Sequence, residues 1–148
     1  MFTVGVFALL FDEDQRILLC HRRDYDLWNL PGGGLETGET PWDGVIREVL
    51  EETGLHVAIE RLAGVYSKQE INEIVFSFVC TIAAGHLTLN DEADRIEYFA
   101  LNEIPSNTSR KQIERIHDAI ENESGLTLKA QHGLSSKQPA GRLGYVSS

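Results

Sequence analysis

Residues 33–55, GGLETGETPWDGVIREVLEETGL, carry the most specific pattern in this chain. Its second half predicts a helix over residues 41–53. Thr40 is a favoured N-cap residue, Pro41 suits the first helical position, and Gly54 is a favoured residue just past a helix end. Apolar side chains recur at three- and four-residue spacing and predict one buried stripe, formed by Trp42, Val45, Ile46, Val49 and Leu50.

Three glutamates of this helix, Glu48, Glu51 and Glu52, share a face opposite the apolar stripe, because they stand three and four positions apart. Like charges this close repel one another, and the nearby Arg47 cannot neutralise all three. A divalent cation can, and ligands that are all oxygen atoms favour a hard ion, Mg²⁺ or Mn²⁺. Taken alone, the three residues are equally typical of a solvated helix face.

The spacing of residues upstream is more specific. Five residues separate Gly33 from Glu39, seven separate Glu39 from Arg47, and Glu48 follows without a gap. This pattern resembles the Nudix box, the signature of the Nudix hydrolase family, written G-x5-E-x7-R-E-U-x-E-E-x-G-U with U an aliphatic residue. Every fixed position is present. The resemblance extends to the flanking segments and implies a Nudix hydrolase domain over residues 1–124.

The resemblance implies an α/β fold, a single-domain α/β/α sandwich around a mixed β-sheet. It also implies hydrolysis of a pyrophosphate bond in a nucleoside diphosphate joined to a second group, by attack of a metal-activated water. Carried over by position, Glu48, Glu51 and Glu52 are the expected catalytic residues and metal ligands, with the backbone carbonyl of Gly32 as a further ligand. The expected cofactor is Mg²⁺, with Mn²⁺ as the alternative. The general base is left open between a helix glutamate and a loop glutamate.

Four residues of the motif have expected structural roles. By resemblance, Arg47 orients a neighbouring glutamate, and Glu39 holds the loop by hydrogen bonds. Gly33 allows a close approach of the backbone, and Gly54 ends the helix.

Outside the motif, the acidic segment 90–94 provides Glu92 as a loop ligand to the metal, against the alternative of a solvated loop. Arg23, and after it Arg22, stand where relatives place a phosphate-binding arginine, against the alternative of surface cations. Four aromatic residues either stack on a base or belong to the core: Phe7, Trp28, Tyr66 and Phe78.

The other expected elements follow from apolar runs and breaker residues. Strands are predicted over 2–11, 16–20, 56–68, 73–83, 86–89 and 96–101. A second helix is predicted after Pro105, with Thr108 or Ser109 as its cap and its end within 121–124.

Residues 125–148 form a predicted C-terminal extension, in which Lys129, Lys137 and Arg142 are the only charged residues. The extension therefore carries +3 and residues 1–124 carry −13. Either it is a mobile extension, or it packs back on the acidic body or on a neighbouring subunit. A homodimer is left open.

Composition excludes several classes of protein. The 148 residues suffice for one domain, and a net charge of −10 argues against a nucleic-acid partner. The apolar run 2–11 is too short to span a bilayer, so no membrane partner is expected. Cys20 and Cys80 are predicted to be buried reduced thiols, and a cytoplasmic protein is expected.

The motif does not select the substrate. The ADP-ribose branch of the family often carries a proline beyond the box, and residues 56–104 contain none. A nucleoside triphosphate or a related small nucleotide is therefore the expected substrate. The alternatives are an ADP-ribose or nucleotide-sugar pyrophosphatase, and a nucleotide-binding sensor that does not hydrolyse its ligand.

Overall fold

Two sheets form the centre of the molecule in the computed structural model, which describes residues 1–133. The five-stranded sheet is mixed and has the order β4 (Gly32–Gly34), β1 (Thr3–Leu9), β6 (Glu73–Gly85), β5 (Leu55–Lys68) and β8 (Thr127–Ala130). β1 pairs in parallel with β6, and β5 pairs in parallel with β8, whereas the other pairings are antiparallel. The second sheet is antiparallel, with the order β3 (Trp28–Asn29), β2 (Ile17–Arg22) and β7 (Ala93–Phe99).

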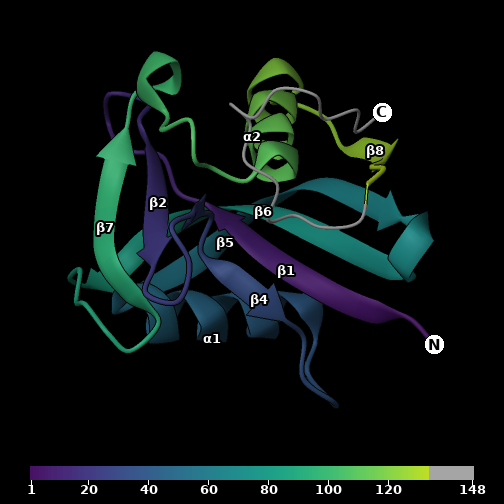
Figure 1. The fold of residues 1–148 in the computed structure, drawn as a ribbon, viewed down its shortest axis with the longest axis horizontal. Helices are drawn as coiled ribbons and strands as arrows, with labels where there is room; N and C mark the ends of the chain where they lie inside the picture. Colours follow the sequence, from purple (N-terminus) through teal and green to yellow (C-terminus); the bar gives the residue numbers. More distant parts are fainter. Residues whose placement is uncertain (134–148) are drawn as a thin grey trace.

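Two helices cover opposite faces of the larger sheet (Figure 1), namely α1 (Pro41–Thr53) and α2 (Arg110–Glu121). Alternate residues of β1 therefore enter different cores: Val6 packs with α1, and Leu9 packs with α2. Two short 3₁₀ helices, Gln69–Ile71 and Leu101–Glu103, complete the described elements. The predicted single-domain α/β/α sandwich is confirmed.

Helix α1 begins and ends where its sequence predicts. The Thr40 side chain accepts a hydrogen bond from the backbone N–H of Asp43 at 3.1 Å, and Gly54 adopts the left-handed conformation with φ of 81°. The buried stripe is narrower than predicted. Val45 and Val49 are fully buried, whereas Trp42, in the first turn of the helix, is 53% exposed and Leu50 is 40% exposed.

The strand predicted over 86–89 is wrong. Gly85 ends β6 with φ of 85°, and the backbone N–H of Thr88 then bonds to the carbonyl of Thr53 at 2.8 Å. The segment crosses the C-terminal end of α1 and contacts the helix instead of a neighbouring strand. The short strands β3 and β4 were not predicted, because two or three residues are too few to show a periodic pattern.

The predicted boundary at residue 124 needs correction, because the packed domain continues to Gly133. β8 adds to the edge of β5, with Gly64 opposite Thr127. Lys129 pairs with Asp118 on α2 at 2.9 Å, so this part of the basic segment packs on the acidic body. Lys137 and Arg142 lie outside the described residues.

Both cysteines are buried and unpaired, as predicted. Burial raises the pKa of each thiol above its ordinary value, which makes the thiols unreactive. No helix within residues 1–133 is long and apolar enough to cross a membrane.

Candidate active site

Two of the helix glutamates, Glu48 and Glu52, lie against strand β4. The backbone N–H of Gly32 donates a hydrogen bond to Oε2 of Glu52 at 2.8 Å. The Glu48 carboxylate is so near Gly33 that a Cβ atom at this glycine would stand 2.8 Å from Oε2 of Glu48. A side chain at residue 33 would therefore displace the Glu48 carboxylate, in agreement with the close approach expected of Gly33.

Arg47 holds the motif together. Its guanidinium group binds both carboxylate oxygens of Glu39, at 2.6 and 3.0 Å. Nη1 also donates to Glu48 and to Glu51, at 3.1 Å each. Glu39 in turn accepts the backbone N–H of Glu36 at 3.0 Å. Arg47 therefore lies where it can orient the helix glutamates, and Glu39 holds the preceding loop.

The pKa values of Glu48 and Glu52, the inner pair of glutamates, shift in the opposite direction from the pKa of Glu39. Burial raises the pKa of Glu48 and of Glu52 above the ordinary range, and the charges of Glu48 and Glu92 raise that of Glu52 further, against the opposing hydrogen bond from Gly32. By contrast, the hydrogen bonds from Arg47 lower the pKa of Glu39. The inner pair therefore resists holding two negative charges without a compensating cation.

Glu51 does not converge with the inner pair. Its side chain is 52% exposed and turns toward Arg47, whereas the Glu48 side chain is 14% exposed. Within residues 1–133, no three His, Cys, Asp or Glu side chains already form a metal cage. The donor set nevertheless fits a hard divalent cation, because two partly buried carboxylates adjoin the backbone of Gly32.

The acidic loop, residues 90–94, contacts the end of the helix that carries Glu52 through a hydrogen bond from Asn90. The Asn90 side-chain amide donates to the backbone carbonyl of Glu52. Its Oδ1 accepts the backbone N–H groups of Glu92 and Ala93, at 2.8 and 2.9 Å. This fastens the loop to the C-terminal end of α1, and Glu92 lines the same cleft as Glu48 and Glu52.

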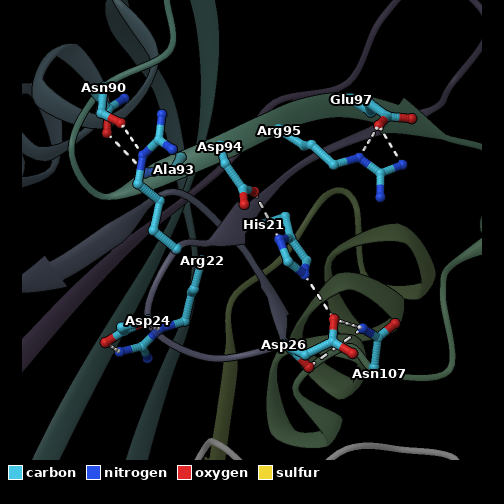
Figure 2. Close-up of polar contacts among 11 residues, drawn as sticks. His21, Arg22, Asp24, Asp26, Asn90, Ala93, Asp94, Arg95, Glu97 and Asn107 are labelled. Atoms are coloured by element: carbon cyan, nitrogen blue, oxygen red, sulfur yellow. Dashed lines mark hydrogen bonds and ion pairs between the residues drawn. The ribbon is translucent and has the colours of Figure 1, made fainter.

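The two predicted arginines also line this cleft. Arg22 binds both carboxylate oxygens of Asp24 at 2.8 Å (Figure 2). Arg23 donates from Nε to the carbonyl of Asn90 at 2.6 Å, and its backbone N–H bonds to the carbonyl of Glu92 at 3.1 Å. Both arginines therefore border the site, each held by a neighbouring loop.

The cleft has a volume of about 610 Å³, and it includes residues that sequence reasoning missed. On the side of α2, Gln112 is 2% exposed and its Oε1 accepts the backbone N–H of Leu30 at 2.6 Å. Lys68 forms an ion pair with Glu73 at 2.7 Å in the cleft wall. These residues come from three separate elements, so no local pattern could have grouped them. A larger hollow, about 720 Å³ beside residues 10–16, contains no predicted site residue.

The four aromatic residues separate into two groups. Phe7 is partly buried and lines the cleft. Trp28, Tyr66 and Phe78 are at most 4% exposed and belong to the interior.

Comparisons with known proteins identify the family. The model described as NUDIX domain matches residues 1–119. The chain is 34% identical over 119 residues to a MutT-like protein of Streptomyces ambofaciens. The matched residues cover 80% of this chain and 77% of that protein. The chain is 36% identical over 103 residues to an ADP-ribose pyrophosphatase of Methanocaldococcus jannaschii, covering 65% of this chain and 61% of that protein.

A solved structure agrees with this result. A crystal structure of UDP-X diphosphatase superposes with a TM-score of 0.76 at 28% identity, over 86% of this chain and 67% of that chain. The chain therefore belongs to the Nudix family of hydrolases, as its box predicted.

Proposed function

We propose that this protein is a metal-dependent hydrolase of the pyrophosphate bond in a nucleoside diphosphate derivative, with a nucleoside triphosphate or a related small nucleotide as substrate. One observation carries the proposal. The inner carboxylates Glu48 and Glu52 share a cleft with Arg22 and Arg23. An anionic end for a cation and a cationic rim for phosphates are thus both present in a single cleft.

The inner carboxylates, the Gly32 carbonyl and Glu92 are the groups proposed to hold Mg²⁺, or Mn²⁺ in its place. When bound, the cation lowers the pKa of a coordinated water and neutralises charge that develops on the transferred phosphoryl group. Arg47 keeps Glu48 in position, and Glu51 completes the acidic face toward solvent.

Glu52 and Glu92 are the two groups proposed as acceptor of the proton from the attacking water. Glu52 is nearly buried and its pKa is raised by burial and by neighbouring carboxylates. A cation bound beside it would lower this pKa and leave the carboxylate ionised, able to accept a proton. Glu92 lines the same cleft, on a loop fastened to α1. Substitution of each residue in turn distinguishes the two.

The substrate phosphates are proposed to bind Arg22 and Arg23. Both arginines line the cleft, and each guanidinium group has one partner that holds it there, Asp24 for Arg22 and the Asn90 carbonyl for Arg23. A guanidinium group is suited to phosphate because it donates two parallel hydrogen bonds. Phe7 provides an aromatic surface for a base in the same cleft.

Two alternative functions differ from this proposal, one in the substrate and the other in the absence of hydrolysis. An ADP-ribose or nucleotide-sugar pyrophosphatase agrees with the names of the Methanocaldococcus relative and of the superposed UDP-X diphosphatase. A sensor that binds without hydrolysis is less consistent with the sequence, because the chain retains every carboxylate of the box.

A panel of nucleotides tests the proposal. Nucleoside triphosphates, ADP-ribose, nucleotide sugars and dinucleoside polyphosphates are incubated with the protein and Mg²⁺ or Mn²⁺. The nucleotide formed and its co-product, which is pyrophosphate, a sugar phosphate or a second nucleotide, are separated by chromatography and measured. We expect metal-dependent turnover that is highest for a triphosphate. Highest turnover of ADP-ribose or a nucleotide sugar would select that alternative, and tight binding without turnover of any compound would select the sensor.

Glu52→Gln is the diagnostic variant. It preserves side-chain size but removes a charge from the inner pair, so turnover should fall by on the order of 10² or more. Glu121→Gln, on the exposed end of α2, is the control for loss of one negative charge and should retain activity. An active Glu52→Gln enzyme would show that the inner pair is not the catalytic centre.

A further inference from the structure

His21 makes hydrogen bonds to carboxylates from both of its ring nitrogens (Figure 2). Nδ1 lies 2.8 Å from Oδ1 of Asp94, and Nε2 lies 2.8 Å from Oδ1 of Asp26. The His21 side chain is only 15% exposed. We call these three residues, His21, Asp26 and Asp94, the His21 bridge.

The bridge requires a protonated ring. A neutral imidazole carries one N–H group, whereas ionised carboxylates only accept hydrogen bonds, so two such bonds at once need an imidazolium. The hydrogen bond to Asp26 raises the pKa of His21 most, and Asp94 adds to this effect against partial burial. In return, the hydrogen bond from His21 lowers the pKa of Asp94.

The other charged groups around His21 have partners of their own. Arg95, opposite His21 on β7, pairs with Glu97 at 2.9 Å and lies over the Trp28 ring. Trp28 itself meets the His21 ring edge-on, with the two centroids 5.1 Å apart. On β2, Arg22 is paired with Asp24. The two bridge carboxylates therefore dominate the field at the ring.

The bridge joins segments that are far apart in the sequence. Pairing of β2 with β7 shifts register between His21 and Arg22, where Ala93 and Arg95 are the paired residues and Asp94 is the extra one. Such a bulge turns a side chain away from the regular pattern, here toward His21. Asp26 also accepts the side-chain amide of Asn107 at 2.9 Å, which ties in the segment before α2.

The segments that carry His21 and Asp94 both border the proposed substrate cleft. Arg22 and Arg23 directly follow His21, and Asp91 and Glu92 directly precede the bulge. We propose that His21 is a positioning residue whose protonated ring holds the arginine loop and the acidic loop together, so that the protein binds its nucleotide more weakly once His21 loses its proton. This inference rests on the proposed function for the identity of the ligand, but not for the bridge itself.

The direction of the pH dependence follows from the raised pKa of His21. Both hydrogen bonds are present below this pKa, and one is lost as the pH rises through it. The KM for the nucleotide should therefore rise by about fivefold over this step, at the lower end of typical coupling between sites, while kcat shows no step at the same pH.

Two variants separate positioning from simple structural support. His21→Gln removes the titrating group, so its KM should be raised and should show no step. Asp94→Asn offers an amide N–H to the neutral ring, so both contacts can persist without the proton. Its KM should stay at the low-pH value of the wild type across the step. His117→Gln, at an exposed position of α2, is the matched control and should behave as the wild type.

Nuclear magnetic resonance on the metal-free and nucleotide-free protein tests the bridge without activity. The His21 imidazole signals are assigned by their loss in His21→Gln. Their titration should give a pKa above the ordinary histidine value, and this pKa should be lower in Asp94→Asn. Hydrogen exchange at the Arg23 backbone N–H, which bonds to the Glu92 carbonyl, should lose protection over the same pH step in the wild type and not in Asp94→Asn.

Two results would overturn the inference. One is titration of His21 at or below the ordinary value of a free histidine. The other is a KM step that persists unchanged in Asp94→Asn, which keeps the histidine and the fold even if His21→Gln does not fold. If no nucleotide is hydrolysed, the proposed function fails, while titration and exchange still decide whether the bridge holds the loops.

Discussion

Arg115 of helix α2 is buried in the interior, a position that its sequence neighbours do not predict. It is fully buried, its Nε donates to Gln131 at 3.0 Å, and neither Nη atom has a hydrogen-bond partner within residues 1–133. The guanidinium lies 5.4 Å from the centroids of the Phe7 and Tyr66 rings. Burial lowers the pKa of Arg115 to about 10, so the side chain stays charged at neutral pH. A buried charge without an ionic partner lowers stability.

Replacing Arg115 with Met should therefore leave the free energy of unfolding unchanged or raise it by up to about 2 kcal/mol, because an apolar side chain of similar length removes the buried charge. Urea denaturation measures the change, with Arg16→Met at an exposed hairpin as the control. A loss of stability greater than about 1 kcal/mol would mean that the aromatic contacts and the Gln131 bond outweigh the cost of desolvation.

At the scale of elements, strand β8 shows how a segment with little local signal becomes part of a domain. Residues 125–133 lack a strong apolar pattern, yet β8 pairs with β5 over four residues. Directly after β8, Gln131 is 3% exposed and donates to the backbone carbonyl of Lys111 at 3.0 Å and to Glu114 at 2.7 Å. The strand thereby fastens α2 to the edge of the sheet.

Truncation tests this role. A chain that ends at residue 124 should be less stable than one that ends at residue 133 by about 3 kcal/mol, because it loses β8 and leaves the buried Arg115 without its one hydrogen-bond partner among the described residues. Thermal unfolding of the two truncated proteins gives the comparison. Equal melting temperatures would restore the predicted boundary at residue 124.

At the scale of the whole molecule, negative charge is in excess, and part of it is concentrated at the cleft. Residues 1–124 carry −13, and Glu48, Glu52, Asp91 and Glu92 all line one cavity. Carboxylates brought together by folding repel one another more in the native state than in the unfolded chain. A ligand cation that binds only the native state therefore stabilises it.

Millimolar Mg²⁺ should raise the melting temperature, with a stabilisation of about 2.7 kcal/mol when the free ion is a hundredfold above its dissociation constant. EDTA should reverse the shift. The Glu48→Gln, Glu52→Gln double variant should lose most of it, and NaCl at equal ionic strength separates specific binding from screening. An equal shift in the double variant would place the bound ions elsewhere on the acidic surface.

Helix α1 and the Nudix box could both be predicted from local sequence alone. Thr40, Pro41 and Gly54 act within one turn of the helix ends, so their roles depend only on neighbours in the chain. Long apolar runs also predicted β5 and β6, since both are long enough to show their pattern. The box spacing identified the family, and with it the fold.

Which of these residues meet depends on how the elements pack together. It separated Glu51 from the inner pair Glu48 and Glu52, because β4 approaches the helix on one side. It also brought Gln112 to the cleft and gave His21 its two carboxylates. These contacts join residues up to 82 positions apart. Their geometry depends on strand pairing, a register shift and the packing of α2, none of which is encoded by the spacing of residues within a single element.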